Sequence, residues 1–164
     1  MKLSPSRRSH FCRAAVERRF NMIQSQLKSI VADAEIHHVG STAIPGLLTK
    51  GDLDVQIRVS AEQFEYAKAE LARLYPVNEG GFRGSEAISF EDYTAQPSVG
   101  IHLTVTGSPS DVQVRFRDLL LSSSTLRREY DELKRLHEGC PMEEYRMAKA
   151  EFVGRVLSGN FSED

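Results

Sequence analysis

The chain has 164 residues, of which 40% are hydrophobic and 27% are charged. These proportions are typical of a globular protein and exclude fibrous, low-complexity and wholly disordered classes, and the length suits a single domain spanning residues 1–164. Lys and Arg number 21 against 23 Asp and Glu, a net charge of −2, which argues against a nucleic-acid partner or an anionic membrane surface.

The sequence also favours a cytoplasmic protein. No apolar run reaches the length of about 18 residues that spans a bilayer, so no membrane partner is expected. The first residues carry basic side chains without the apolar stretch of a signal peptide. The two cysteines, Cys12 and Cys140, stand at opposite ends of the chain and form no CxxC motif, which fits a reducing compartment.

In chain order, the first predicted element is a long helix over about residues 6–32. Its apolar stripe has spacings of three and four: Val16, Phe20, Ile23, Leu27 and Ile30. Residues 36–39 are predicted as a short strand that enters a glycine turn. Alternating apolar residues then predict a half-buried strand from Leu53 to Val59. A helix follows to about Leu74, with Ser60 as its N-cap and Gln63 at the capping-box position.

Two more strands are predicted over residues 87–93 and 99–106, joined as a hairpin across Gln96-Pro97. Three helices follow, near residues 110–121, 124–138 and 142–157. Strands followed by helices argue for an α+β fold. We therefore expect a small mixed β-sheet packed with helices, a long N-terminal helix and a helical C-terminal layer.

Asp52 and Asp54 are the first candidate site residues. Side chains two apart in a strand point to the same face, about 6.5–7 Å apart along the backbone. A divalent cation removes the repulsion between two such carboxylates, and Mg²⁺ typically takes one or two carboxylates plus substrate phosphate oxygens. The alternative is an acidic, solvated face of an antiparallel sheet.

The turn Gly40-Ser41 lies eleven residues before the first of these aspartates. Glycine lets backbone N–H groups approach a phosphate closely, and a serine hydroxyl can donate to it. A Gly-Ser turn followed by Asp-x-Asp at the start of a strand resembles the signature of the DNA polymerase β-like nucleotidyltransferase superfamily. That resemblance implies a turn that holds a triphosphate and carboxylates that hold two metal ions.

A closer resemblance lies in residues 38–47, HVGSTAIPGL, followed by residues 50–55, KGDLDV. These segments look like the hallmark of the GrpB family, also called UPF0157. The likeness continues in order to about residue 157, through Ile101-His102-Leu103, Phe116 to Leu120, Tyr130 to Lys134, Tyr145 to Lys149 and Phe152. It implies a nucleotidyltransferase-like fold, a suspected nucleotidyltransferase activity and, through relatives fused to dephospho-CoA kinase, a link to nucleotide or coenzyme A metabolism. The motif also brings Thr42 and Lys50 into the expected nucleotide site.

The polymerase β-like pattern has a third carboxylate on a neighbouring strand, and the matching strand here has none. Its polar face carries Gly100, His102 and Thr104. Glu91, on the preceding strand, is the first candidate for the missing metal ligand, and a solvated acidic residue is the alternative. His102 can act as a metal ligand or as a base near the substrate hydroxyl, or it can be a histidine bonded within the sheet.

Two lysines of the C-terminal helices are candidate phosphate ligands. Lys134 and Lys149 each lie four residues after a tyrosine, beside an apolar stripe. A lysine facing a core needs an anionic partner or a path to solvent. With Arg115 or Arg117 they can form a cationic wall opposite the Gly40-Ser41 turn, or they can pair with carboxylates. Lys149 is the stronger candidate, because Asp131 and Glu138 stand ready to pair with Lys134.

The leading hypothesis is transfer of a nucleoside monophosphate from a nucleoside triphosphate to an unknown small-molecule or protein acceptor. Asp52, Asp54 and Glu91 would hold Mg²⁺ or Mn²⁺, and the turn and the lysines would bind the phosphates. The second hypothesis is a nucleotide- or CoA-precursor-binding module without turnover, which the missing carboxylate favours. The third is a protein-interaction domain that uses the helical layer. The base, the acceptor and the oligomeric state are left open.

Overall fold

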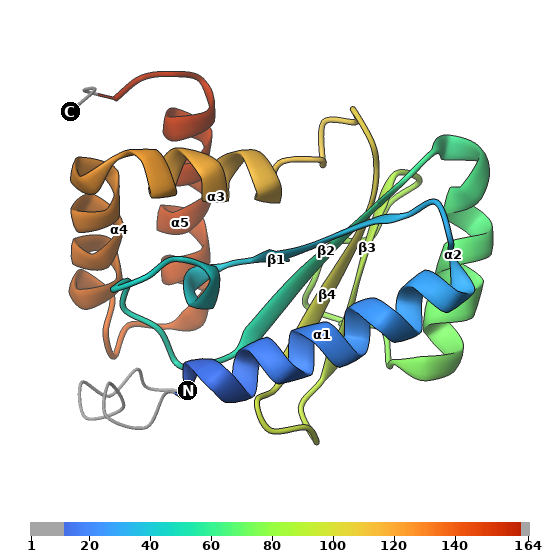
Figure 1. The fold of residues 1–164 in the computed structure, drawn as a ribbon. Helices are drawn as coiled ribbons and strands as arrows, with labels where there is room; N and C mark the ends of the chain where they lie inside the picture. Colours follow the sequence, from blue (N-terminus) through green and yellow to red (C-terminus); the bar gives the residue numbers. More distant parts are fainter. Residues whose placement is uncertain (1–11, 162–164) are drawn as a thin grey trace.

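The sheet has four strands in the order β1-β2-β4-β3 (Figure 1). The computed structural model describes residues 12–161. Strand β2 pairs antiparallel with β1 and parallel with β4, and β3 pairs antiparallel with β4. The strand bounds are Glu35–Val39 for β1, Leu53–Val59 for β2, Ala87–Asp92 for β3 and Val99–Val105 for β4. This arrangement confirms the small mixed sheet that the sequence predicts, including the placement of the His102 strand beside the aspartate strand.

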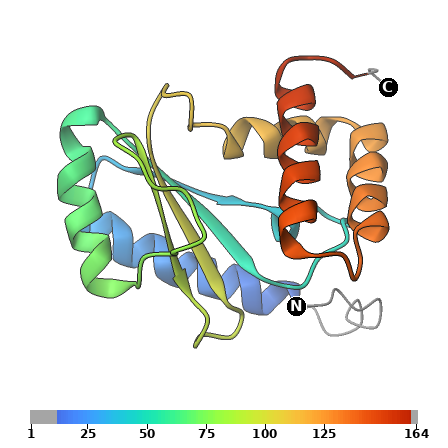
Figure 2. The same cartoon turned by 180° about the vertical axis from the view of Figure 1, so that it is seen from behind.

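Five helices surround this sheet in the described part of the chain. Their bounds are Arg13–Ile30 for α1, Ala61–Leu74 for α2, Gln113–Ser122 for α3, Ser124–Leu136 for α4 and Met142–Leu157 for α5. The helices α1 and α2 lie against the sheet, whereas α3, α4 and α5 gather as a separate group near β1 (Figures 1 and 2). The α+β class is confirmed. The predicted residues 6–11 of the first helix lie outside the described residues.

The two helical groups enclose two apolar cores. The larger core joins α1 and α2 to one face of the sheet, where the alternating residues Leu53, Val55, Ile57 and Val59 of β2 are buried. The smaller core lies among α3, α4 and α5 and includes Ile44 and Leu47, which follow the glycine turn. Because these two side chains are buried among the helices, the segment after the turn is tied to the helical layer.

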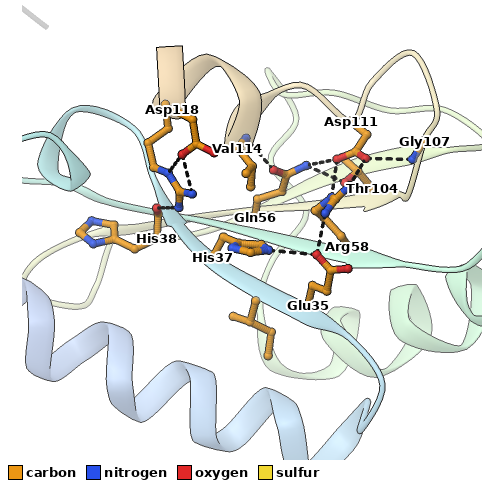
Figure 3. Close-up of polar contacts among 12 residues, drawn as sticks. Glu35, His37, His38, Gln56, Arg58, Thr104, Gly107, Asp111, Val114 and Asp118 are labelled. Atoms are coloured by element: carbon orange, nitrogen blue, oxygen red, sulfur yellow. Dashed lines mark hydrogen bonds and ion pairs between the residues drawn. The ribbon is translucent and has the colours of Figure 1, made fainter. Parts of the chain in front are cut away.

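The polar face of β2 anchors the start of α3 (Figure 3). Arg58 donates to both carboxylate oxygens of Asp111, over 2.8 Å each. The fully buried Gln56 donates to Thr104 and to Asp111, over 2.9 Å each, and its Oε1 accepts the N–H of Val114 over 3.0 Å. The connection from β4 to α3 is therefore fixed to the sheet by a satisfied polar network.

The capping-box prediction for α2 is wrong. The helix begins after Ser60 as expected, but the Gln63 side chain donates to Asp33 over 3.5 Å. The Ser60 hydroxyl makes no capping hydrogen bond to the helix. No helix within residues 12–161 combines the length and the apolar character needed to cross a bilayer.

We predict that Asp111→Asn destabilises the fold by about 2 kcal/mol near neutral pH, because the variant leaves Arg58 without its buried counter-charge. Burial raises the pKa of Asp111, but hydrogen bonds from Arg58, Gly107 and Gln56 outweigh burial and hold this pKa below its ordinary value. The carboxylate therefore stabilises the fold above its unfolded-state pKa of about 4, and this contribution is lost as the pH falls through the lower folded-state pKa.

Urea unfolding of the wild type and of Asp111→Asn, at neutral pH and near pH 2, measures this effect. The difference in unfolding free energy should shrink in acid. Glu129→Gln is the control, since the ion pair between Glu129 and Arg155 is largely exposed and contributes about 0.5 kcal/mol or less. An equal loss for Asp111→Asn at both pH values would contradict the assignment.

Candidate functional site

The glycine turn lies directly against Asp54. Gly40 follows β1 with φ of 75°, a left-handed conformation that favours glycine, and leads into the short 3-10 helix η2, Ser41–Ala43. A Cβ atom added to Gly40 would overlap the Asp54 carboxylate, and one added to Gly100 on β4 would lie 2.9 Å from Asp54 Oδ1. The two glycines together leave the space that the half-buried Asp54 side chain occupies.

Thr42 and His38 hold the turn to the start of β2. The Thr42 hydroxyl donates to the backbone carbonyl of Asp52 over 3.0 Å and lies 2.8 Å from Nε2 of His38. The His38 ring stacks on Phe20 with centroids 5.5 Å apart, and burial lowers the pKa of His38. His38 is therefore neutral at neutral pH and acts as a structural residue. Thr42 is buried with its hydroxyl engaged, so it positions the turn.

Asp52 and Glu91 lie at the same end of the sheet as Asp54. Asp52 precedes β2 by one residue, and its carboxylate accepts a hydrogen bond from Ser98 Oγ over 2.8 Å. Glu91 on β3 is paired with Gly100, which is paired with Asp54. Glu91 and Asp54 therefore share a face of the sheet across one intervening strand, about 10 Å apart at the backbone. No group of three or more metal-binding side chains is preformed among residues 12–161.

His102 lies next to Asp54 on the polar face. Its Nε2 is 3.6 Å from Asp54 Oδ1, and its Nδ1 is 3.1 Å from the hydroxyl of Ser89. Ser89 Oγ also accepts the backbone N–H of Phe82 over 3.3 Å. The serine thus fixes one ring nitrogen of His102 and leaves the other facing Asp54.

Lys134 reaches the turn from α4. Its Nζ donates to Ser41 Oγ over 2.8 Å and to the carbonyl of Leu48 over 2.6 Å, and it stands 4.2 Å from the centre of the Tyr130 ring. The side chain is buried, with 6% of its surface exposed. Asp131, the partner that the sequence suggested, instead accepts the backbone N–H of Leu48 over 2.8 Å.

The electrostatics of Lys134 favour an anionic ligand. The pKa of Lys134 is lowered to about 7, chiefly by burial and also by the nearby charge of Lys149, and the charges of Asp131 and Asp54 offset this lowering only in part. No ion pair compensates its ammonium group within the described part of the chain. A buried cation beside a glycine turn is stabilised by an anion such as a phosphate.

The remaining candidate cations have different surroundings. Lys149 on α5 and Lys50, in the segment between the turn and β2, are exposed. Arg117 donates to the carbonyl of His38 over 2.9 Å and pairs with Asp118 at 2.8 Å, so it braces the end of β1 (Figure 3). Arg115 donates to the carbonyl of Leu157 over 2.6 Å and stays within the helical layer. Of the expected cationic wall, Lys134 is the member that contacts the turn.

Sequence reasoning missed the role of Gly100 and of Ser89. A glycine inside a strand signals the close approach of another group, which here is the Asp54 carboxylate. Ser89 lies two residues from Glu91 on the same face of the sheet. It is paired with His102 when β3 and β4 are aligned as a hairpin. The role of Gly100 depends on the pairing of β2 with β4, and the role of Ser89 depends on the pairing of β3 with β4.

We predict that Gly40→Ala displaces Asp54 as well as straining the turn. With φ of 75° and ψ of −173°, Gly40 lies in a backbone region that is essentially restricted to glycine, so an alanine there costs about 1–3 kcal/mol from strain alone. Gly40→Ala in an Asp54→Ala background is the matched control, since it keeps this strain and removes the carboxylate that the added Cβ would overlap. Gly40→Ala should therefore lose more unfolding free energy in the wild type than in the Asp54→Ala background. Equal losses in the two backgrounds would show that Asp54 does not depend on the space at Gly40.

Comparisons with known proteins agree with this architecture. The family model described as GrpB protein matches residues 12–158. A UPF0157 protein of Vibrio cholerae is 31% identical over 145 residues, which cover 88% of this chain and 77% of that protein. The crystal structure of GrpB from Enterococcus faecalis superposes with a TM-score of 0.63 at 18% identity, over 96% of this chain and 98% of that one. A Cid1 poly(U) polymerase mutant bound to MgATP gives a TM-score of 0.49 at 15% identity, over 80% of this chain and 41% of the polymerase. The chain thus belongs to the GrpB family.

Proposed function

We propose that the protein is a nucleotidyltransferase that binds a nucleoside triphosphate at the Gly40-Ser41 turn and transfers its nucleoside monophosphate to an acceptor. One observation carries this proposal: the turn stands between a carboxylate, Asp54, and a buried ammonium group, Lys134. A triphosphate needs backbone N–H groups, a cation and a metal-binding carboxylate around it. The turn, the lysine and the aspartate supply these three elements.

The carboxylates fit a magnesium or manganese ion. Mg²⁺ takes oxygen ligands and commonly uses one or two protein carboxylates together with phosphate oxygens. Asp52 and Asp54 would hold the ion, with Glu91 as a third candidate from β3. When bound, the ion neutralises phosphate charge and polarises the reacting phosphorus.

Phosphate binding and proton transfer would fall to groups of the protein itself. Gly40 and Ser41 would cradle the phosphates, and Lys134 would neutralise charge as pyrophosphate leaves. Lys149, Lys50 and Arg117 would add positive potential around the same phosphates. His102 would accept the proton of the acceptor hydroxyl at Nε2, because Ser89 engages Nδ1.

A second candidate function is a non-catalytic nucleotide- or CoA-precursor-binding module. It is favoured by the separation of Glu91 from Asp54 across one strand, and by the finding that no three-ligand group is preformed within residues 12–161. Such a module would use the turn and Lys134 for binding and would have no transferase step.

Nucleotide binding followed by pyrophosphate detection distinguishes the two functions. Each of the four ribonucleoside triphosphates is titrated with and without Mg²⁺, and pyrophosphate is then measured in the presence of a cell-extract metabolite fraction. Mg²⁺-dependent binding with pyrophosphate release supports transfer, and binding without release supports the module. Absence of binding by every triphosphate would overturn the proposed function and favour a protein-interaction domain.

A further inference from the structure

A pocket lies beside His102 on the polar face of the sheet, and no residue of the Gly40-Ser41 turn lines it. It has a volume of about 270 Å³ and is formed by β3, β4, the connection after β4 and the start of α3. Its lining includes the polar-face residues Ser89, His102 and Thr104, together with Phe82, Val112 and Gln113. The pocket is close to the lower limit of typical small-molecule sites, so it suits a small ligand or one part of a larger ligand.

The lining of this pocket is neutral and amphipathic. The described residues around it include no lysine, arginine, aspartate or glutamate. Phe82 and Val112 offer apolar surface, whereas Ser110 and Gln113 offer hydroxyl and amide groups. The site therefore lacks the charges that would bind a phosphate or a free amine, in contrast to the turn with Lys134.

Gln113 provides evidence that a polar ligand belongs there. Its side-chain Oε1 is enclosed and has no hydrogen-bond partner among residues 12–161. Buried carbonyl oxygens are normally paired, and an unpaired one is a candidate acceptor for a ligand. Because Gln113 lines the pocket, a rotation of its side chain would turn this enclosed oxygen toward a hydroxyl or N–H group of a ligand.

His102 connects the pocket to the phosphate site. The ring forms part of the pocket, its Nδ1 is fixed by Ser89, and its Nε2 lies 3.6 Å from Asp54. We propose that this pocket binds the acceptor substrate, a neutral molecule that carries a hydroxyl group, and presents that hydroxyl to His102 beside Asp54. This assignment rests on the proposed nucleotidyltransferase function.

In the resulting reaction, the acceptor hydroxyl gives its proton to Nε2 of His102. The acceptor oxygen forms a bond to the α-phosphorus of the triphosphate. The bond between the α-phosphorus and its bridging oxygen breaks, and pyrophosphate leaves with that electron pair. The protein itself forms no covalent intermediate, since the acceptor oxygen is the nucleophile.

The test compares neutral acceptors with their phosphorylated counterparts. Glycerol, glucose and adenosine are paired with glycerol 3-phosphate, glucose 6-phosphate and AMP, and the affinity of each for the full chain is measured by chemical-shift titration of the nitrogen-labelled protein. At least one neutral member should bind more tightly than its charged partner and should perturb the side-chain amide signal of Gln113. Tighter binding of every charged partner, or no binding by any neutral member, would overturn the proposal.

Substitutions in the lining test whether the neutral probe binds in this pocket. Gln113→Leu should weaken binding of the neutral probe at least tenfold, because it removes the unpaired acceptor while keeping the side-chain size. Ser110→Phe should fill the pocket, and Thr106→Phe is its control at an exposed position outside the lining. Unchanged probe binding in both Gln113→Leu and Ser110→Phe would overturn the assignment.

Titration of the same variants with Mg²⁺ and ATP separates the two proposals. ATP binding that survives in Gln113→Leu while probe binding is lost supports two distinct subsites. If ATP binds but no neutral probe binds, the acceptor-site assignment is refuted and the proposed nucleotide site is not. Neutral-probe binding in a protein that binds no nucleotide leaves a small-molecule pocket but refutes its role as an acceptor site in nucleotidyl transfer.

Discussion

Asp54→Asn is expected to abolish Mg²⁺-dependent binding of a nucleoside triphosphate, with a loss of at least a hundredfold in affinity, or about 2.7 kcal/mol. The amide cannot replace the carboxylate as a ligand for a hard cation. The fold should remain intact, because the nearest charged partner of Asp54 within residues 12–161 is His102 at 3.6 Å, too far for a hydrogen bond, and removal of the carboxylate charge relieves repulsion with Asp52.

Isothermal titration with ATP, in Mg²⁺ and in EDTA, measures this effect, and thermal unfolding checks the fold. Asp33→Asn is the matched control, because Asp33 is exposed and lies at the other end of β1. An Asp54→Asn protein that binds Mg²⁺-ATP with wild-type affinity would remove the metal role from this residue. Equal losses with and without Mg²⁺ would point to a general disturbance of the turn.

Lys134→Met should weaken triphosphate binding at least tenfold at neutral pH, or about 1.4 kcal/mol. The methionine keeps an unbranched aliphatic side chain but provides no ammonium group at Ser41 or over the Tyr130 ring. Lys149→Met provides the comparison, since Lys149 is exposed and its charge lies near the same site. The contacts of Lys134 predict the larger loss for Lys134→Met, which reverses the order that the sequence suggested.

The lowered pKa of Lys134 predicts a second difference between Lys134→Met and the wild type, in the pH dependence of stability. Burial lowers the folded-state pKa of Lys134 to about 7, below its unfolded-state value of about 10.4. Between these values the unfolded chain binds the proton that the folded chain has released, so the wild-type fold gains stability as the pH rises from 7 to about 10. Lys134→Met lacks this gain, which chemical unfolding at several pH values can measure.

Nucleotide binding should have the opposite pH dependence. A bound triphosphate stabilises the ammonium form, so binding above pH 7 takes up a proton and weakens as the pH rises. Calorimetry in buffers of different ionisation enthalpy detects this uptake. A wild-type protein that binds without proton uptake, together with a Lys134→Met protein that retains full affinity but loses stability, would identify Lys134 as purely structural.

The local pattern of the chain was sufficient to predict its elements. The period-two alternation from Leu53 to Val59 and the stripe from Val16 to Ile30 each describe one buried face, and both faces meet in the same core. Element boundaries were less well determined, since the helix predicted to begin near residue 110 begins at Gln113. Side-chain contacts were also missed: the Gln63 side chain donates to Asp33 on a neighbouring segment, a contact that the capping-box pattern cannot anticipate.

The candidate site was predictable where it depended on short spacing. Gly40, Asp52 and Asp54 lie within fifteen residues, and the motif that contains them carries the family resemblance. The role of Lys134 depends on a contact across 93 positions, with Ser41, and on Asp131 being engaged by Leu48. Tertiary packing decides which partner each side chain binds, so helical spacing alone did not predict that Lys134 contacts the turn.

The central claim is that a metal-bound triphosphate binds at the Gly40-Ser41 turn, with Asp54 as a ligand of its metal ion and Lys134 on its phosphates. A crystal structure with Mn²⁺ and a non-hydrolysable ATP analogue, with anomalous diffraction at the manganese edge, tests it most directly. The account predicts an anomalous peak in contact with Asp54, and phosphates that contact the turn and Lys134. Manganese bound away from Asp54, or an analogue whose phosphates lie away from Ser41, would contradict it.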